Sequence, residues 1–171
     1  MGVLYSDEVR LDQARRELVD LYGPIDYQSK PFPFTVTDYY EEEMGRGIHR
    51  LFFSLGLLIS PEEIVQIKLR TNWLEGELAH KGRRRVNIDP GYMDYNKVVL
   101  SSRKYNGQKV YLGSGIYADL TLYYAKGKFH PYPWSFPDFK SGQYNPVFLR
   151  IRELYKAQRK GGSSWLHKAT S

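Results

Sequence analysis

Residues 83–125 alternate apolar and polar side chains more regularly than any other part of the chain. A period of two residues is typical of β-strands with one buried face. Turn residues divide this stretch at Asp89-Pro90-Gly91, Asn106-Gly107 and Gly113-Ser114-Gly115, and proline and glycine favour tight turns there. We therefore predict an antiparallel meander, with strands over 85–88, 97–102, 110–112 and 116–124.

Two details of this meander depend on short patterns. A helix beginning at Asp94 is an alternative for 97–102, because a short apolar run fits either structure. Strict alternation over 116–124 places four aliphatic residues on one face and four polar or aromatic residues on the other. The second set is Tyr117, Asp119, Thr121 and Tyr123.

Three amphipathic helices are predicted from their start and stop signals. The first begins at Ser6 as N-cap and ends at Gly23-Pro24. The second begins at Ser60-Pro61-Glu62-Glu63, where the serine hydroxyl and Glu63 carboxylate can cap each other's amides. The third begins at Asn145-Pro146 and ends at Gly161. Their predicted buried faces hold Leu11, Ala14, Leu18 and Leu21, then Ile64, Ile67, Leu74 and Leu78, then Phe148, Ile151 and Leu154 or Tyr155.

The order of elements predicts an α+β fold. Residues 1–5 and 49–59 are further strand candidates, and the prolines in 25–37 allow only an edge strand or irregular structure there. Strand, helix, strand, strand, helix, strand is the order of a ferredoxin-like split βαβ unit. We expect such a core extended by the meander and a C-terminal helix, in a single domain over 1–160 followed by a flexible tail over 161–171.

Charge and composition limit the partners. The chain of 171 residues has a net charge of +6, but residues 146–171 hold six Lys or Arg against one Glu, so the rest is close to neutral. No broad basic face is therefore expected on the core. The absence of cysteine excludes thiolate metal sites and cysteine nucleophiles. No stretch is long and apolar enough for a membrane span, and no signal peptide pattern opens the chain, so we expect a cytoplasmic protein.

Several strings resemble an uncharacterised prokaryotic family, a domain of unknown function. They are Arg84-Arg85-Val86-Asn87-Ile88-Asp89-Pro90-Gly91-Tyr92, Tyr111-Leu112-Gly113-Ser114-Gly115-Ile116-Tyr117-Ala118 and Pro133-Trp134-Ser135-Phe136-Pro137-Asp138. The resemblance extends to about Lys156, and family members usually start some residues upstream of Met1. It implies no catalytic residues. Some members carry an automatic GTP-binding label, but the phosphate loop G-x-x-x-x-G-K-[ST] is absent from this sequence.

The arginine cluster before the meander is one candidate site. Arg83 and Arg85 would share a strand face with Asn87 and Asp89, and guanidinium groups bind phosphates and carboxylates through paired hydrogen bonds. Asp89 at the strand end is a candidate catalytic carboxylate. The alternatives are a solvated surface for the arginines and a backbone-capping role for Asp89.

An acidic run and an aromatic segment are the other candidates. The carboxylates of 38–43 could hold Mg²⁺, stay in solvent, or pair with the arginines. Prolines and aromatic residues alternate over 129–144, which predicts an ordered loop that is neither helix nor central strand. Such a loop could stack a planar ligand or could simply cover the sheet. Its candidate residues, with neighbouring tyrosines, are His130 as an acid or base and Tyr92, Tyr111, Tyr117 and Trp134 as ligand-binding side chains.

The function predicted from these patterns is binding of a small anionic ligand in a pocket between the sheet and the aromatic loop. The alternative is a non-catalytic module that contacts nucleic acid through the basic C-terminal helix. The sequence leaves catalysis and the cofactor unknown, indicates no membrane partner, and is compatible with a monomer or with a homodimer formed through an exposed sheet edge.

Overall fold

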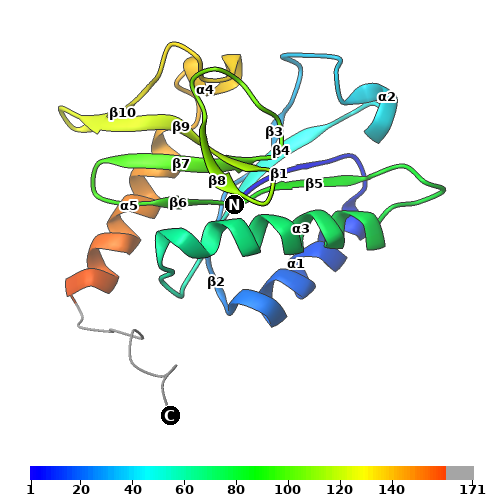
Figure 1. Ribbon diagram of the computed structural model, residues 1–171, viewed down its shortest axis with the longest axis horizontal. Coiled ribbons are helices and arrows are strands. Elements are labelled where there is room, and N and C mark those ends of the chain that lie inside the picture. Colours follow the sequence, from blue (N-terminus) through cyan, green and yellow to red (C-terminus); the bar gives the residue numbers. More distant parts are fainter. Residues whose placement is uncertain (161–171) are drawn as a thin grey trace.

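The computed structural model describes residues 1–160 and has a mixed α+β architecture with two antiparallel sheets (Figure 1). The α+β prediction is therefore confirmed. The predicted tail at 161–171 lies outside the described residues. Figure 1 shows α1 (Glu8–Tyr22) and α3 (Ile64–Glu77) together below the sheets, and α5 (Asn145–Lys160), in orange, at the left.

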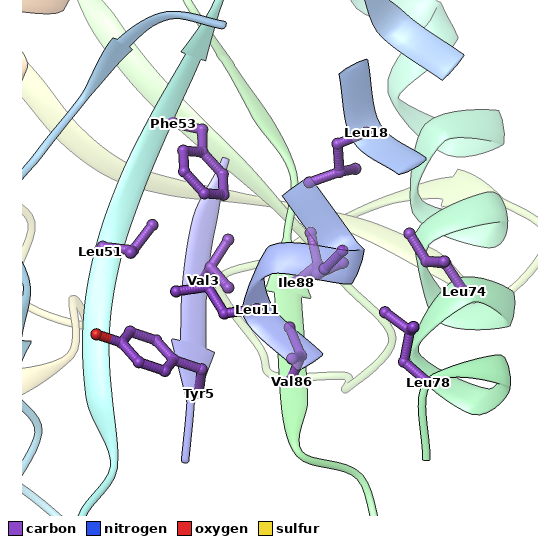
Figure 2. Packing of buried hydrophobic residues seen from close by; sticks show 11 residues of the cluster. Val3, Tyr5, Leu11, Leu18, Leu51, Phe53, Leu74, Leu78, Val86 and Ile88 are labelled. Carbon is purple, nitrogen blue, oxygen red and sulfur yellow. The ribbon is translucent and has the colours of Figure 1, made fainter. Parts of the chain in front are cut away.

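Sheet 1 has the strand order β2-β4-β1-β5, with the short β3 also paired to β4. Its strands are β1 (Gly2–Tyr5), β2 (Ile25–Gln28), β3 (Phe32–Pro33), β4 (His49–Leu55) and β5 (Val86–Asp89). Alternate residues of the central strands point toward α1 and α3 (Figure 2). The cluster that they form with the two helices is the first core: Val3, Tyr5, Leu11, Ala14, Leu18, Leu51, Phe53, Leu74, Leu78, Val86 and Ile88.

The helix starts follow the predicted signals with one correction. The N-cap of α1 is Asp7, whose carboxylate accepts from the Arg10 amide at 3.1 Å. Ser6, the predicted N-cap, instead donates its hydroxyl to the Met44 carbonyl. The capping box before α3 is confirmed, although its first turn, η1 (Pro61–Glu63), is a 3-10 helix. The Ser60 amide donates to the Glu63 carboxylate at 2.6 Å.

The open edge of β5 is covered by two charged side chains of α3. Glu75 accepts from the Ile88 amide at 2.7 Å, and the Lys68 ammonium donates to the Ile88 carbonyl at 2.7 Å. Both side chains are almost fully buried. They satisfy the backbone groups that a further strand would otherwise use, and a covered edge cannot pair with another chain.

Sheet 2 contains β6 (Gly91–Met93), β7 (Lys97–Ser102), β8 (Val110–Gly113), β9 (Ile116–Ala125) and β10 (Lys128–Pro131). Its order is β10-β9-β7-β6, with β8 paired only to β9. The strand over 97–102 is confirmed, and the helix alternative is wrong. The simple meander is also wrong, because β7 pairs directly with β9 and not with β8. Residues 103–109 therefore connect two strands on opposite sides of β9.

Two local predictions in this sheet need correction. Asp89-Pro90-Gly91 forms no tight turn, because the chain passes through Pro90 from β5 in sheet 1 to β6 in sheet 2. The predicted alternation along β9 is interrupted by an irregularity in its pairing with β7, where Val98 and Val99 face Leu122 and Leu120. Thr121 is the extra residue, and a bulge of this kind changes which residues share a face.

The aromatic segment 129–144 is more regular than predicted, and the prediction that it contains no helix is wrong. It contains most of the edge strand β10 and the short helix α4 (Pro137–Lys140), which begins at Pro137 because proline fits the first helical turn. Its aromatic side chains pack with α5 and both sheets in a second core. That core comprises Phe32, Phe52, Val98, Leu122, Phe129, Phe139, Tyr144, Val147 and Phe148.

Candidate functional site

A cavity of about 1050 Å³ lies where the two sheets meet α5. Apolar and aromatic side chains form most of its wall. They come from the end of β4, the loop 56–60, α3, the β6–β7 hairpin and α5. Representative residues are Phe52, Leu58, Ile67, Tyr92, Met93 and Ile151. A cavity of this size and composition is typical of small-molecule sites, which are concave and mostly apolar.

The loop 56–60 follows β4 and contributes three consecutive apolar residues to the cavity wall. Leu57 is 43% exposed and Ile59 is 36% exposed. Gly56 and Gln158 hold the loop in place, since the Gly56 amide donates to the Pro24 carbonyl and the Gln158 amide donates to the Gly56 carbonyl at 3.0 Å. Apolar side chains are thus partly open to solvent at the edge of the cavity.

Gly91 determines how closely the β6 wall can approach β7. A Cβ atom at this position would lie 2.3 Å from the Val99 carbonyl oxygen and 2.8 Å from a Leu100 methyl carbon. The predicted reason for this glycine, a tight turn, is wrong, because Gly91 lies in β6 and does not have a positive φ. The missing side chain instead permits the close strand contact.

We expect Gly91→Ala to lower the free energy of unfolding by about 3 kcal/mol, because overpacking against backbone cannot relax by side-chain rotation. Urea denaturation measures this change. Gly76→Ala is the matched control: a Cβ at Gly76 in α3 meets nothing within 4 Å, and alanine is the better helix former by roughly 1 kcal/mol. Equal stability of the two variants would contradict the close-contact explanation.

Charged and polar groups lie at the rim of the cavity. Asp94 forms an ion pair with Lys97, which raises the pKa of the Lys97 ammonium. Glu63 is held by the Ser60 amide. Arg159 is exposed and forms no salt bridge within residues 1–160. Its guanidinium group is therefore the rim cation available to an anionic ligand.

The structure separates most of the predicted site residues. Of these residues, only Tyr92 lines the cavity. Asp89 binds Lys68 at 3.3 Å on sheet 1, whereas His130 lies on β10 with its Nε2 3.1 Å from the Ala125 carbonyl. No residue of 129–144 lines the cavity, so the cavity does not lie against the predicted aromatic loop.

The arginines also differ from their predicted arrangement. The strand alternation does not extend back to Arg83, because residues 80–83 form a tight turn with Lys81 and Gly82 at positive φ. Arg83 is exposed, and Arg85 donates to the Met44 carbonyl at 2.9 Å. Arg84 is the member of the cluster that bonds to Asn87, at 3.1 Å.

Arg84 is the centre of a charged network that sequence reasoning largely missed. It donates two hydrogen bonds to Glu43 of α2 (Glu41–Met44), at 2.5 and 2.7 Å, and one to the buried Glu75 at 2.6 Å. The Arg84 contact lowers the pKa of Glu43, whereas burial raises that of Glu75. Pairing of the acidic run with the arginines, one of the three alternatives, is confirmed for Glu43. The remaining contacts involve Lys68 and Glu75, which are seven residues apart in α3 and therefore lie on the same, buried face of the helix. Two charged residues at this spacing on an apolar helix face were the signal in the sequence.

The aromatic residues are distributed over two groups. Tyr111 and Tyr117 contact each other across β8 and β9, with ring centroids 5.2 Å apart. Trp134 stacks on Tyr132 at 5.0 Å and donates its indole N–H to the Leu120 carbonyl at 2.8 Å. Trp134 is 41% exposed, so its ring lies on the sheet with one side partly open to solvent. No group of three or more metal-ligating side chains occurs among residues 1–160.

Comparison with known proteins identifies the family but no activity. The family described as "Domain of unknown function (DUF4416)" matches residues 1–155. The chain belongs to this family. No curated protein and no solved structure matches it. Within the described part of the chain, every helix is too short or too polar to cross a membrane.

Proposed function

We propose that this member of the family binds a small molecule with a mainly apolar body and one anionic group in the cavity between the two sheets and α5. The observation that carries the proposal is the cavity itself, about 1050 Å³ in volume with mainly apolar and aromatic walls. Burial of an apolar ligand body there is favourable in proportion to the area removed from water. Arg159 at the rim supports the anionic group.

The ligand would therefore lie away from the predicted aromatic loop, and Tyr92 is the one residue of the predicted site that lines its cavity. Asp89 pairs with Lys68, and Arg84 pairs with Glu43 and Glu75, which leaves both side chains fewer donors and acceptors for a ligand. We also propose that sheet 1 with α1 and α3 is a ferredoxin-like core, which the order β2-β4-β1-β5 with antiparallel neighbours supports.

Thermal shift and calorimetry with straight-chain carboxylic acids of increasing length, and with the matching alcohols, test the cavity. We expect binding to strengthen with each added methylene until the cavity is filled. Ile151→Trp and Leu58→Trp fill the cavity from two walls and should each weaken binding at least about tenfold. Ala157→Trp is the matched control, because Ala157 lies on α5 but does not line the cavity.

The role of the rim cation has its own comparison. Arg159→Gln should weaken carboxylate binding about threefold and leave alcohol binding unchanged, because an exposed ion pair contributes little. Two results would overturn the proposal: absence of binding by every acid and alcohol of the series, or unchanged affinity in both cavity-filling variants.

The alternative function, nucleic-acid contact through the basic C-terminal helix, has weaker support. Arg150 pairs with Glu153 at 3.2 Å. Arg152 donates to the Tyr95 carbonyl at 2.9 Å and lies 3.6 Å from the centre of the Tyr124 ring. These two cations are thus engaged within the protein, which leaves fewer charges on α5 for phosphate groups.

A further inference from the structure

A half-exposed row of aromatic rings lies on β9, β10 and the loop that follows. We call it the aromatic strip, in spatial order His130, Tyr123, Tyr132 and Trp134. Neighbouring ring centroids are 5.2, 5.2 and 5.0 Å apart along this row. Tyr123 is 39% exposed and Trp134 is 41% exposed. A contiguous group of large aromatic side chains that are partly exposed to solvent is typical of a binding surface.

The register of the hairpin explains why these rings are on the outside. Leu122 and Phe129 belong to the second core, and their chain neighbours Tyr123 and His130 form a cross-strand pair. Successive residues of a strand point to opposite faces, so this pair faces away from that core. His130 stacks on Tyr123 with an angle of 19° between the ring planes.

The loop that carries the other two rings is held in place by hydrogen bonds. The Ser135 hydroxyl donates to the Thr121 carbonyl at 2.6 Å and accepts from the Tyr132 amide at 3.0 Å. The Trp134 indole binds the adjacent Leu120 carbonyl. The bulge in β9 thus supplies the carbonyl groups that fix the loop, and a fixed ring loses little entropy when a ligand stacks on it.

The charge around the strip is positive. Residues 120–137 contain Lys126 and Lys128 but no Asp or Glu. Lys126 and Lys128 are exposed at the β9–β10 turn and form no salt bridge within residues 1–160. Lys97 lies opposite Tyr123 but is neutralised by Asp94. Aromatic platforms beside uncompensated cations are the arrangement that binds unpaired bases and their phosphates.

Lys126 occupies its turn at a conformational cost. Its φ is +49° and that of Gly127 is +83°, a pair of values typical of a two-residue hairpin turn that favours Asn-Gly. Lysine is no better suited than asparagine to the positive φ that this turn requires. Its charge beside the aromatic strip is a reason for its presence.

We propose that the aromatic strip, with Lys126 and Lys128, binds single-stranded nucleic acid. Bases stack on the exposed rings of Tyr123 and Trp134, and the two lysines contact phosphates. This surface is separate from the cavity proposed above, since none of these six residues lines that cavity. It is also separate from the basic face of α5.

Fluorescence anisotropy of the full chain with a labelled single-stranded oligothymidine of about 12 nucleotides tests the proposal. We expect binding that weakens with salt. Tyr123→Ser should lower the affinity on the order of tenfold, because stacking on a ring is lost. The double variant Lys126→Asn, Lys128→Gln should make the slope of log K against log salt shallower by about 1.4. This variant suits the turn better, so loss of folding cannot explain its effect.

Two full-length controls locate the surface. Trp73→Leu removes a half-exposed tryptophan of α3 that stacks on Arg70, and it should not change binding. Arg159→Gln with Lys160→Gln removes charge from α5 and should leave both the affinity and its salt dependence unchanged. The proposal is overturned if no single strand binds, if a duplex of equal length binds as tightly, if a neutral oligosaccharide binds in place of the oligonucleotide, or if the α5 variant alone abolishes binding.

Discussion

Asp138→Leu should lower the free energy of unfolding by about 3–5 kcal/mol, the largest effect expected for a single side chain outside the apolar cores. Asp138 and Arg50 form a buried salt bridge at 3.2 Å, with side chains 1% and 6% exposed. Tyr144 donates its hydroxyl to the same carboxylate at 2.9 Å. Without Asp138, the guanidinium charge of Arg50 remains in the interior with no opposite charge to compensate its lost hydration.

The double variant Arg50→Met, Asp138→Leu distinguishes the loss of the pair from the loss of one partner. Replacing both charges by apolar groups should recover most of the stability, because the buried charge is then absent. Arg50 also lies over the rings of Phe34 and Phe139, at 4.9 and 5.2 Å from their centres, so a methionine keeps part of that packing. Chemical denaturation of the three variants measures the effect. A double variant less stable than Asp138→Leu would contradict this explanation.

Arg84→Met should lower the free energy of unfolding by about 2–3 kcal/mol at pH 7, and less at pH 5. Arg84 compensates the negative charge of Glu75, whose side chain is 2% exposed. Burial already raises the pKa of Glu75 above its ordinary value of 4.5. Removing the guanidinium group raises this pKa further, because the deprotonated form loses its partner.

The sign of the pH dependence follows from this shift. A carboxyl whose pKa is higher in the folded than in the unfolded state destabilises the fold once it must be deprotonated. The loss in Arg84→Met should therefore be small near pH 4.5 and increase as the pH rises through the pKa of Glu75 in the folded variant. Arg83→Met is the matched control, since the neighbouring Arg83 is exposed, and its stability should change by less than about 0.5 kcal/mol at any pH. A loss in Arg84→Met that is independent of pH would show that Glu75 does not respond to Arg84.

The capping box before α3 could be predicted from the sequence, whereas the arrangement of the arginines before β5 could not. The capping box at Ser60 and Glu63 is confirmed because both partners lie within one turn of the chain. The prediction for the arginines extended the strand alternation back to Arg83. The turn at Lys81-Gly82 places Arg83 outside the strand, so the alternation does not include it. As a result Arg84 carries the charged network. A turn of two residues is enough to change which side of a strand a side chain occupies.

The cavity could not be predicted from the sequence. Its walls come from residues as far apart as Phe52, Tyr92 and Ile151, and its volume depends on the distance between elements. Gly91 shows the same limit in one residue. The tripeptide Asp89-Pro90-Gly91 predicted a turn, but the role of Gly91 is set by the Val99 carbonyl of a neighbouring strand.

The three long helices, most strands and the α+β class could be predicted from the amino-acid sequence, because caps, periodicity and turn residues act between positions close along the chain. Three features became visible only in the folded chain: β8 pairs on the far side of β9, Lys68 and Glu75 cover the edge of β5, and a cavity opens beside α5. These features depend on contacts between distant residues, which no local pattern specifies.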